Sequence, residues 1–215
     1  TIEARKIQSE KILSQLKNRN VFENKTLLDV GAGSGVLLEV SKKFGLISRG
    51  IEPSKSLQKL ANDNNLDVIL GILPSKHLQD KFDFVSLIDV IEHVNNPENL
   101  LKEINKVLKL NGKLFLVTPD VDSFFSKLLK FKWWHFRVAH IGYFNQKTLN
   151  ILITKCGYEV IKYQRPKWYF PISYILNRLL SYISTKIEIK LPKSIDIIIP
   201  LNLFDSYLVE CKKIN

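Results

Sequence analysis

The sequence predicts an α/β fold, built as a doubly wound parallel sheet with helices on both faces. Apolar runs of strand length alternate with helical runs over residues 26–118, and repeated units of this kind form parallel sheets covered by helices. The first apolar run ends at Asp29 and then breaks into alternating glycines, which is typical of a strand that enters a tight turn beside a ligand. The length of 215 residues fits one domain, residues 1–215, with modest insertions.

The individual elements follow from the spacing of apolar residues. An N-terminal helix is expected within residues 1–20, where apolar residues recur at roughly helical spacing. Further helices are expected at residues 36–44, 54–62, 97–108 and 146–156. Strands are expected at residues 26–30, 46–51, 67–70, 82–88, 113–118 and 158–163, with a last, edge strand at 203–212. Gly45, Ser54 and Pro97 stand at helix ends that their residue types favour.

Composition and charge restrict the class of protein. A hydrophobic content of 45% and a charged content of 25% are ordinary for a soluble globular protein, and no apolar run approaches the length of a membrane span. Cys156 and Cys211 form no paired motif, and the polar N-terminal residues do not resemble a signal peptide, so a cytoplasmic setting is expected. The formal net charge of +11 fits a Lys-rich solvated surface, an anionic substrate, a membrane face or a nucleic acid.

The turn after the first predicted strand has the sequence Asp29-Val-Gly-Ala-Gly-Ser-Gly35. Its three glycines let the backbone approach a bound molecule, and backbone N–H groups near a helix start favour negative charge. Dinucleotide sites place the third glycine one residue later, in G-x-G-x-x-G, which makes an NAD-dependent reductase the least favoured alternative. The structural alternative is a turn that merely connects a strand to a helix.

Further acids fall at the carboxyl ends of predicted strands, where open α/β sheets bind their ligands. Glu52, followed by Pro53, stands about 20 residues beyond the glycine turn, an offset at which an acid can accept both ribose hydroxyls. Asp89 and Val90 follow the fourth predicted strand. Each acid also has a structural alternative, since Asp29 can tie down the glycine turn and Asp89 can cap the loop that follows it.

These motifs resemble those of the class I S-adenosylmethionine (SAM) dependent methyltransferases over roughly residues 24–163. The glycine turn is similar to motif I of that family. The runs D-V-I-E-H-V from Asp89 and L-K-x-x-G-K-L-F-L-V-T-P from Leu108 resemble the branch that includes ubiquinone-biosynthesis O-methyltransferases and polysaccharide-pathway methyltransferases. The resemblance implies a Rossmann-like sheet of seven strands with an antiparallel last strand, SAM as the cofactor and S-adenosylhomocysteine as the product.

The same resemblance assigns the cofactor contacts. The methionine moiety would be bound by one acid and by the backbone of the turn, namely Asp29, Gly31, Ala32, Gly33, Ser34 and Gly35. Glu52 with Pro53 would hold the ribose, and Asp89 with Val90 would line the floor beside the sulfonium. Members of the family often carry an acid near the adenine after the third strand. Here Ile72 occupies that loop, so adenine contacts there are expected to be apolar or through the backbone.

Histidines are the candidate bases, because a hydroxyl acceptor loses a proton on methylation and histidine titrates near neutral pH. His93 directly follows the fourth strand at the mouth of the site. His140 lies in an H-x-x-Y-F segment that resembles the cover of the acceptor pocket in this branch, with Tyr143 as its orienting partner. A structural role in that cover is an equal alternative for His140. The resemblance to the quinone enzymes suggests that Glu92 and His93 touch a divalent metal, but two ligands are too few to assign a metal site.

Two segments, residues 121–145 and 164–202, interrupt the predicted fold, and we expect both on the acceptor side of the site. The aromatic run at 133–136 in the first segment is expected to pack inside a lid. The second segment is apolar and aromatic up to Tyr182, with basic residues interspersed. We interpret it first as a lid that excludes water, second as a patch in peripheral contact with a membrane, and third as a homodimer interface.

The sequence therefore predicts a SAM-dependent methyltransferase that acts on a small-molecule acceptor, at a hydroxyl oxygen of a sugar, a quinone-like or a lipid-linked compound. A nucleic-acid methyltransferase is the alternative that the net charge of +11 favours, although the run from Asp89 replaces the D/N-P-P-Y/F sequence typical of enzymes that methylate bases. A non-catalytic SAM-binding module is a third alternative, because one fold hosts many functions.

Overall fold

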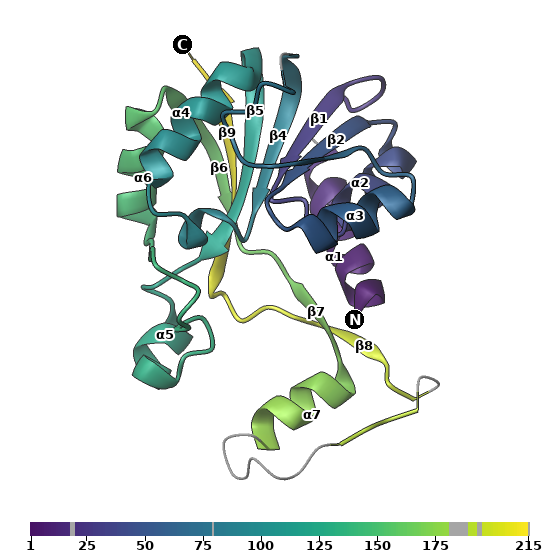
Figure 1. Ribbon diagram of the computed structural model, residues 1–215. Coiled ribbons are helices and arrows are strands. Elements are labelled where there is room, and N and C mark those ends of the chain that lie inside the picture. The colour runs from purple at the N-terminus through teal and green to yellow at the C-terminus, as the bar shows by residue number, and fades with distance from the viewer. Residues whose placement is uncertain (18–19, 79, 181–188, 193–194, 215) are drawn as a thin grey trace.

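The computed structural model describes residues 1–17, 20–78, 80–180, 189–192 and 195–214 (Figure 1). Seven strands form one sheet in the order β3-β2-β1-β4-β5-β9-β6. Their bounds are β1 Thr26–Val30, β2 Ile47–Glu52, β3 Val68–Leu70, β4 Phe82–Ile88, β5 Leu108–Pro119, β6 Tyr158–Gln164 and β9 Ser206–Lys213. Neighbouring strands from β3 to β5 are parallel, whereas β9 is antiparallel to both β5 and β6. The predicted sheet of seven strands with an antiparallel last strand is therefore confirmed.

The prediction that the last strand lies on a sheet edge is wrong. β9 pairs with β5 on one side and with β6 on the other, so β6 forms the edge. Residues 206–211 are buried, and among them Glu210 is fully buried. The Nζ atom of Lys113 on β5 lies 3.0 Å from the Glu210 carboxylate. A charged residue is tolerated inside the sheet because a neighbouring strand supplies its counter-ion.

Helices cover both faces of the sheet, as predicted (Figure 1). Their bounds are α1 Ile2–Lys17, α2 Val36–Ser41, α3 Lys55–Asp63, α4 Pro97–Val107 and α6 Gln146–Lys155. One hydrophobic core joins the sheet to α4 and α6, and a second joins it to α1 and α2. Successive residues of one strand alternate between the two cores, since Leu28 belongs to the first and Leu27 to the second.

The predicted helix ends are also confirmed. Gly45 follows α2 and the short 3₁₀ turn η1 (Lys42–Phe44) with a positive φ of 76°. The Ser54 side chain accepts a hydrogen bond from the Leu57 N–H at the start of α3, and Pro97 occupies the first turn of α4. These residues therefore fix where the helices begin and end.

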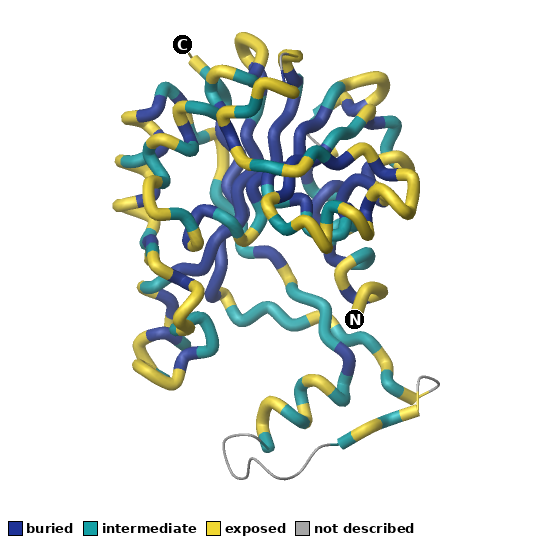
Figure 2. Tube along the Cα trace, viewed as in Figure 1, coloured by how far each residue is buried: buried dark blue, intermediate teal, exposed yellow. Residues whose placement is uncertain are grey.

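Two excursions leave the sheet at the end where its parallel strands finish (Figures 1 and 2). The first contains α5 (Phe124–Leu129) and the 3₁₀ turn η3 (Lys130–Lys132). The second is a two-stranded antiparallel ribbon, β7 (Trp168–Pro171) with β8 (Ile198–Leu201), and α7 (Ile172–Leu180) follows β7. Tyr182, predicted to belong to this apolar stretch, lies outside the described residues. Among the helices of the described chain, none combines the length and apolar character that crossing a membrane requires.

Candidate active site

The turn after β1 has a backbone that only glycine adopts readily. Gly31, Gly33 and Gly35 all have positive φ, at 77°, 55° and 78°. A Cβ atom at Gly31 would clash with Val90, and one at Gly35 would lie 2.6 Å from Leu66 Cδ1, so internal packing closes both positions. A Cβ atom at Gly33, in contrast, would meet nothing within 4 Å. Gly33 therefore lies against open space, as expected for backbone that contacts a bound molecule.

Glu52 lies beside this turn and is 7% exposed. Its Oε2 atom accepts a hydrogen bond from the Gly33 N–H at 2.8 Å, and its Oε1 atom accepts one from the Ser54 N–H at 2.9 Å. Pro53 between them is exposed. Each carboxylate oxygen retains a further lone pair. The fixed carboxylate can therefore accept hydrogen bonds from two neighbouring hydroxyls of a ligand, which is the contact predicted for the ribose.

Asp29 lies at the carboxyl end of β1 and is 5% exposed. Ser86, its register partner on β4, donates a hydrogen bond from Oγ to Asp29 Oδ1 at 2.6 Å. Burial raises the pKa of Asp29 to about 7, the hydrogen bond from Ser86 opposes this shift, and the charge of Glu52 adds to it. A cationic ligand group beside Asp29 would favour its ionised form. Sequence reasoning missed Ser86, whose only signal is a hydroxyl within the apolar run of β4.

Further predicted cofactor contacts follow β4 and β3. Asp89 is exposed and has a positive φ of 52°, which is uncommon for a residue with a side chain. Val90 lies against Gly31, so the predicted floor residue contacts the glycine turn. Ile72 is 68% exposed after β3, which leaves an apolar side chain accessible where adenine contacts are predicted. The individual cofactor contacts of these residues stay predictions.

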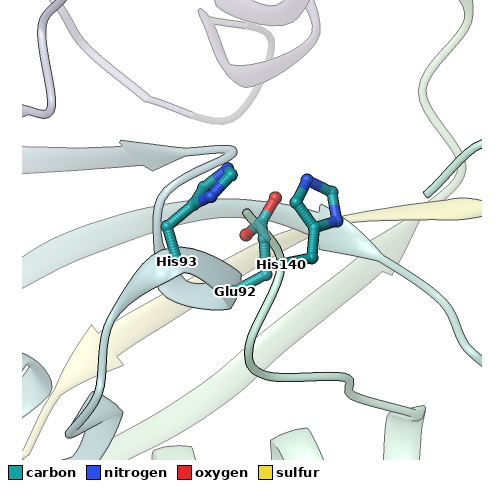
Figure 3. A group of neighbouring side chains, drawn as sticks. All are labelled: Glu92, His93 and His140. Carbon is teal, nitrogen blue, oxygen red and sulfur yellow. The ribbon is translucent and has the colours of Figure 1, made fainter. Parts of the chain in front are cut away.

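A second group of polar side chains begins directly beyond this floor. Glu92, His93 and His140 bring potential ligand atoms within 4.8 Å of one another (Figure 3). Glu92 and His93 belong to the 3₁₀ turn η2 (Ile91–His93), whereas His140 comes from the first excursion. The Nδ1 atom of His93 lies 2.7 Å from the Ala139 carbonyl oxygen. The structure therefore brings together two segments that are far apart in the sequence.

Within this cluster, Glu92 and His140 are buried and His93 is exposed. Thr118 Oγ1 donates a hydrogen bond to Glu92 Oε2 at 3.1 Å, whereas Glu92 Oε1 and His140 Nδ1 have no hydrogen-bond partner among the described residues. Burial raises the pKa of Glu92 to about 7, and hydrogen bonds from its own backbone and from Thr118 oppose the shift. Burial, followed by the nearby charges of His93 and Arg137, lowers the pKa of His140 to about 4. His140 is therefore neutral near physiological pH.

The segment that carries His140 is fixed to the site by its backbone. The N–H groups of residues 141 and 142 both donate to the Glu92 carbonyl oxygen at 2.9 Å. Tyr143 is 37% exposed, and its ring centroid lies 6.4 Å from that of His140, a distance of ring packing rather than of a hydrogen bond. The orienting role of Tyr143 stays a prediction.

The sequence indicates Glu92 and His93 as two possible metal ligands, and the structure adds His140 as a third. A carboxylate and two imidazoles have the donor chemistry of a divalent transition-metal site. The two unpartnered atoms, Glu92 Oε1 and His140 Nδ1, fit such an ion. They fit equally a ligand hydroxyl, which can donate one hydrogen bond and accept another.

The aromatic run of the first excursion packs against the end of the sheet. Trp133 is 1% exposed, which confirms its predicted burial. Trp134 Nε1 donates a hydrogen bond to Asp205 Oδ2 at 2.8 Å, and His135 Nε2 lies 3.3 Å from the same oxygen. Asp205 is 2% exposed and stands 71 residues beyond Trp134. Sequence reasoning missed Asp205 because no local pattern connects residues so far apart.

The fold and the glycine turn define a class I SAM-dependent methyltransferase. Such enzymes bind SAM at the carboxyl ends of their parallel strands, and the open backbone at Gly33 with the carboxylates of Asp29 and Glu52 fits this cofactor. A family model described as a methyltransferase domain matches residues 4–163, and the chain belongs to this family. SAM is accordingly its cofactor.

Curated relatives match part of the chain. The ubiquinone biosynthesis O-methyltransferase of Pelagibacter ubique is 33% identical over 118 residues, which cover 51% of this chain and 49% of that protein. Its mitochondrial counterpart in Schizosaccharomyces pombe is 30% identical over 111 residues, which cover 47% of this chain and 40% of that protein. The chain thus spans about half the length, or less, of the curated relatives it matches.

Solved structures show the same fold over nearly the whole chain. A SAM-dependent methyltransferase from Thermotoga maritima superposes with a TM-score of 0.64 at 21% identity, covering 100% of this chain and 91% of that one. The complex of the Haloferax volcanii Trm112 methyltransferase activator with its methyltransferase gives a TM-score of 0.67 at 14% identity, with 97% and 91% covered. At these identities the likeness establishes the architecture alone.

Proposed function

We propose that this chain transfers the methyl group of SAM to a hydroxyl oxygen of a small molecule. The cluster of Glu92, His93 and His140, directly beyond the floor residue Val90, carries this proposal. A hydroxyl acceptor loses a proton as it is methylated, and a cluster of a carboxylate and two imidazoles supplies a proton acceptor at that place. The relatives named as ubiquinone biosynthesis O-methyltransferases support an oxygen acceptor.

When bound, SAM supplies a methyl group on a sulfonium, and the work of the protein is alignment and proton removal. The unpartnered Glu92 Oε1 accepts the hydrogen bond of the acceptor hydroxyl and then its proton, while Thr118 holds the other carboxylate oxygen. Neutral His140 offers its unpartnered Nδ1 to the same acceptor. His93 is exposed and can pass the proton to solvent. Glu92 therefore joins His93 and His140 as a candidate base.

The surroundings of the site extend the proposal. Residues 164–202 would act as a lid, as a patch in peripheral contact with a membrane, or as a homodimer interface, and the setting would be cytoplasmic. The acceptor class stays within sugars, quinone-like compounds and lipid-linked compounds. The net charge of +11 supports a nucleic-acid acceptor as the alternative.

A single-turnover assay with methyl-labelled SAM tests this function. The panel would contain catechols, hydroquinones, sugar nucleotides, lipid-linked sugars and RNA. We expect label on an oxygen of one small-molecule class, and a decrease of about 100-fold in the Glu92→Gln variant at unchanged SAM affinity. Glu159→Gln, on the exposed surface of β6, is the matched control. Label on RNA alone would favour the alternative, and bound SAM without any transfer would favour a non-catalytic module.

A further inference from the structure

The first excursion exposes an unusual number of apolar side chains. The most exposed of them, by relative accessible surface, are Phe124 at 69%, Leu128 at 60%, Phe131 at 94% and Val138 at 100%. Single exposed apolar residues are ordinary, but a group of them within one short segment marks an interaction surface. We call residues 124–138 the basic apolar patch.

The basic apolar patch is held in place by buried contacts. Trp133 is buried within it, and Trp134 is hydrogen-bonded to the buried Asp205. The Ser123 side chain caps α5 by accepting a hydrogen bond from the Ser126 N–H at 3.2 Å. The exposed side chains are therefore carried on a fixed scaffold and do not pack inward.

The charge of the basic apolar patch is strongly positive. It contains four cationic residues and no acid, and all four are exposed: Lys127, Lys130, Lys132 and Arg137. The nearest acid before it, Asp122, lies 3.5 Å from the Nζ atom of Lys127. Apolar and aromatic side chains interleaved with lysine and arginine suit the headgroup boundary of an anionic bilayer.

A second protrusion of similar chemistry leaves the same end of the sheet. α7 projects from the end at which the parallel strands finish, as α5 does (Figures 1 and 2). It exposes Tyr174 at 52%, Leu176 at 36% and Leu179 at 59%, and it carries Arg178. The glycine turn and the Glu92 cluster follow strands that end on this side. Both protrusions therefore flank the end of the molecule that carries the candidate active site.

We propose that the basic apolar patch docks on an anionic phospholipid bilayer, with α7 as a second contact. A nucleic acid would pair with the cations, but it would leave Val138 and Leu128 without an apolar environment. In a dimer formed through this patch, the four cations of one copy would face the four cations of the other. Their mutual repulsion disfavours self-association. A bilayer surface accepts both kinds of side chain. Docking does not depend on the proposed methyl transfer, although it would bring the site to the lipid surface.

Vesicle sedimentation of the full chain, without SAM, tests the docking. The vesicles would be pure phosphatidylcholine and an equimolar mixture with phosphatidylglycerol. We expect binding to the anionic vesicles that is at least about tenfold stronger than to the neutral ones and that weakens with added salt. Equal binding to both vesicles, or none to either, would overturn the proposal.

Two matched pairs of variants locate the contact. The double variant Phe131→Ser, Val138→Ser should weaken anionic vesicle binding by about tenfold. The double variant Val21→Ser, Leu110→Ser, with side chains 74% and 70% exposed before β1 and near the start of β5, should not. Lys127→Glu with Lys132→Glu should weaken it by at least about tenfold. Lys42→Glu with Lys43→Glu makes the same change in net charge in η1, before the amino end of β2, and should have a smaller effect. Equal losses in the paired variants would contradict a localised patch.

An insertion probe separates a bilayer from the other partners. An environment-sensitive dye on Val138→Cys should shift its emission to the blue with anionic vesicles, while the same dye on Leu110→Cys should not. The native thiols of Cys156 and Cys211 are buried and should label poorly. An unshifted dye would overturn the proposal. Two other results would also overturn it. One is a dimer, detected by light scattering, that is lost in the Phe131→Ser, Val138→Ser double variant, and the other is binding of RNA without binding of vesicles.

Discussion

Ser86 of β4 donates a hydrogen bond to Asp29 of β1 at 2.6 Å, across the strand pair where the order of the sheet reverses. The acid of the glycine turn is therefore attached to the strand that leads into Glu92 and His93. Val90 adds a second link, since its side chain lies against Gly31. The glycine turn and the Glu92 cluster consequently share one hydrogen-bonded strand pair.

Asp29 should make the stability of the protein depend on pH. Burial raises its pKa from 3.8 to about 7, so between these values the folded protein holds a proton that the unfolded chain releases. The free energy of unfolding should therefore decrease as pH rises from about 4 to about 7 and level off above. Asp29→Asn should remove this component and be more stable than the native protein by about 1–3 kcal/mol near pH 8. Urea denaturation across this range measures it, and parallel profiles for both proteins would contradict it.

Glu52→Ala should weaken SAM binding without unfolding the chain. The carboxylate holds the Gly33 N–H and is placed to accept the ribose hydroxyls, and charged hydrogen bonds of this kind correspond to a loss of about 10–100-fold. Isothermal titration calorimetry measures the affinity, with Glu159→Ala as an exposed control. An unchanged dissociation constant would show that Glu52 does not hold the ribose.

Alanine at Gly33 and at Gly31 should have different effects. Both positions have positive φ, which costs a residue with a Cβ atom about 1–2 kcal/mol. At Gly33 the new methyl group enters open space, so SAM affinity should fall more than stability. At Gly31 it clashes with Val90, so stability should fall further, and adding Val90→Ala should restore part of it. Thermal unfolding and calorimetry together distinguish the two, and identical profiles would contradict the geometry.

Thr118→Val should slow methyl transfer and leave SAM affinity unchanged. The Thr118 hydroxyl holds Glu92 Oε2 at 3.1 Å, and valine keeps its shape but not its hydrogen bond. We expect the turnover number to fall by about tenfold for the acceptor identified by the single-turnover assay. His140→Ala should reduce it further, because the acceptor would lose the proposed contact with the unpartnered Nδ1 atom. Unaltered turnover in both variants would remove the cluster from the reaction.

Local features of the chain made the glycine turn and the acids beside it predictable. The glycine spacing fixes the turn, and the acids that follow β1 and β2 lie together because parallel strands end at one edge of the sheet. The predicted bounds of β1 and β4 match the observed ones, and those of β2, β3 and β6 differ by one residue at one or both ends. The start of β5 was predicted five residues too late and that of β9 three residues too early, because apolar periodicity records burial and not the end of strand pairing.

The remaining features depend on contacts between distant segments. The position of β9 inside the sheet follows from pairing with β5 and β6, which its own residues do not specify. The approach of His140 to Glu92 and the hydrogen bond between Trp134 and Asp205 likewise join excursions to the sheet. Ser86 was missed for a different reason, since one hydroxyl barely alters the apolar pattern of β4.

The interior place of β9 has a consequence for biosynthesis. In the folded sheet β9 lies between β5 and β6, and it follows both in the chain, after the β7–α7–β8 excursion. A nascent chain that contains β1 to β6 but not β9 therefore has unpaired backbone groups on the edges of β5 and β6 that β9 later pairs with. Nascent chains that lack β9 should accordingly expose the backbone edge of β5 to pairing with other chains.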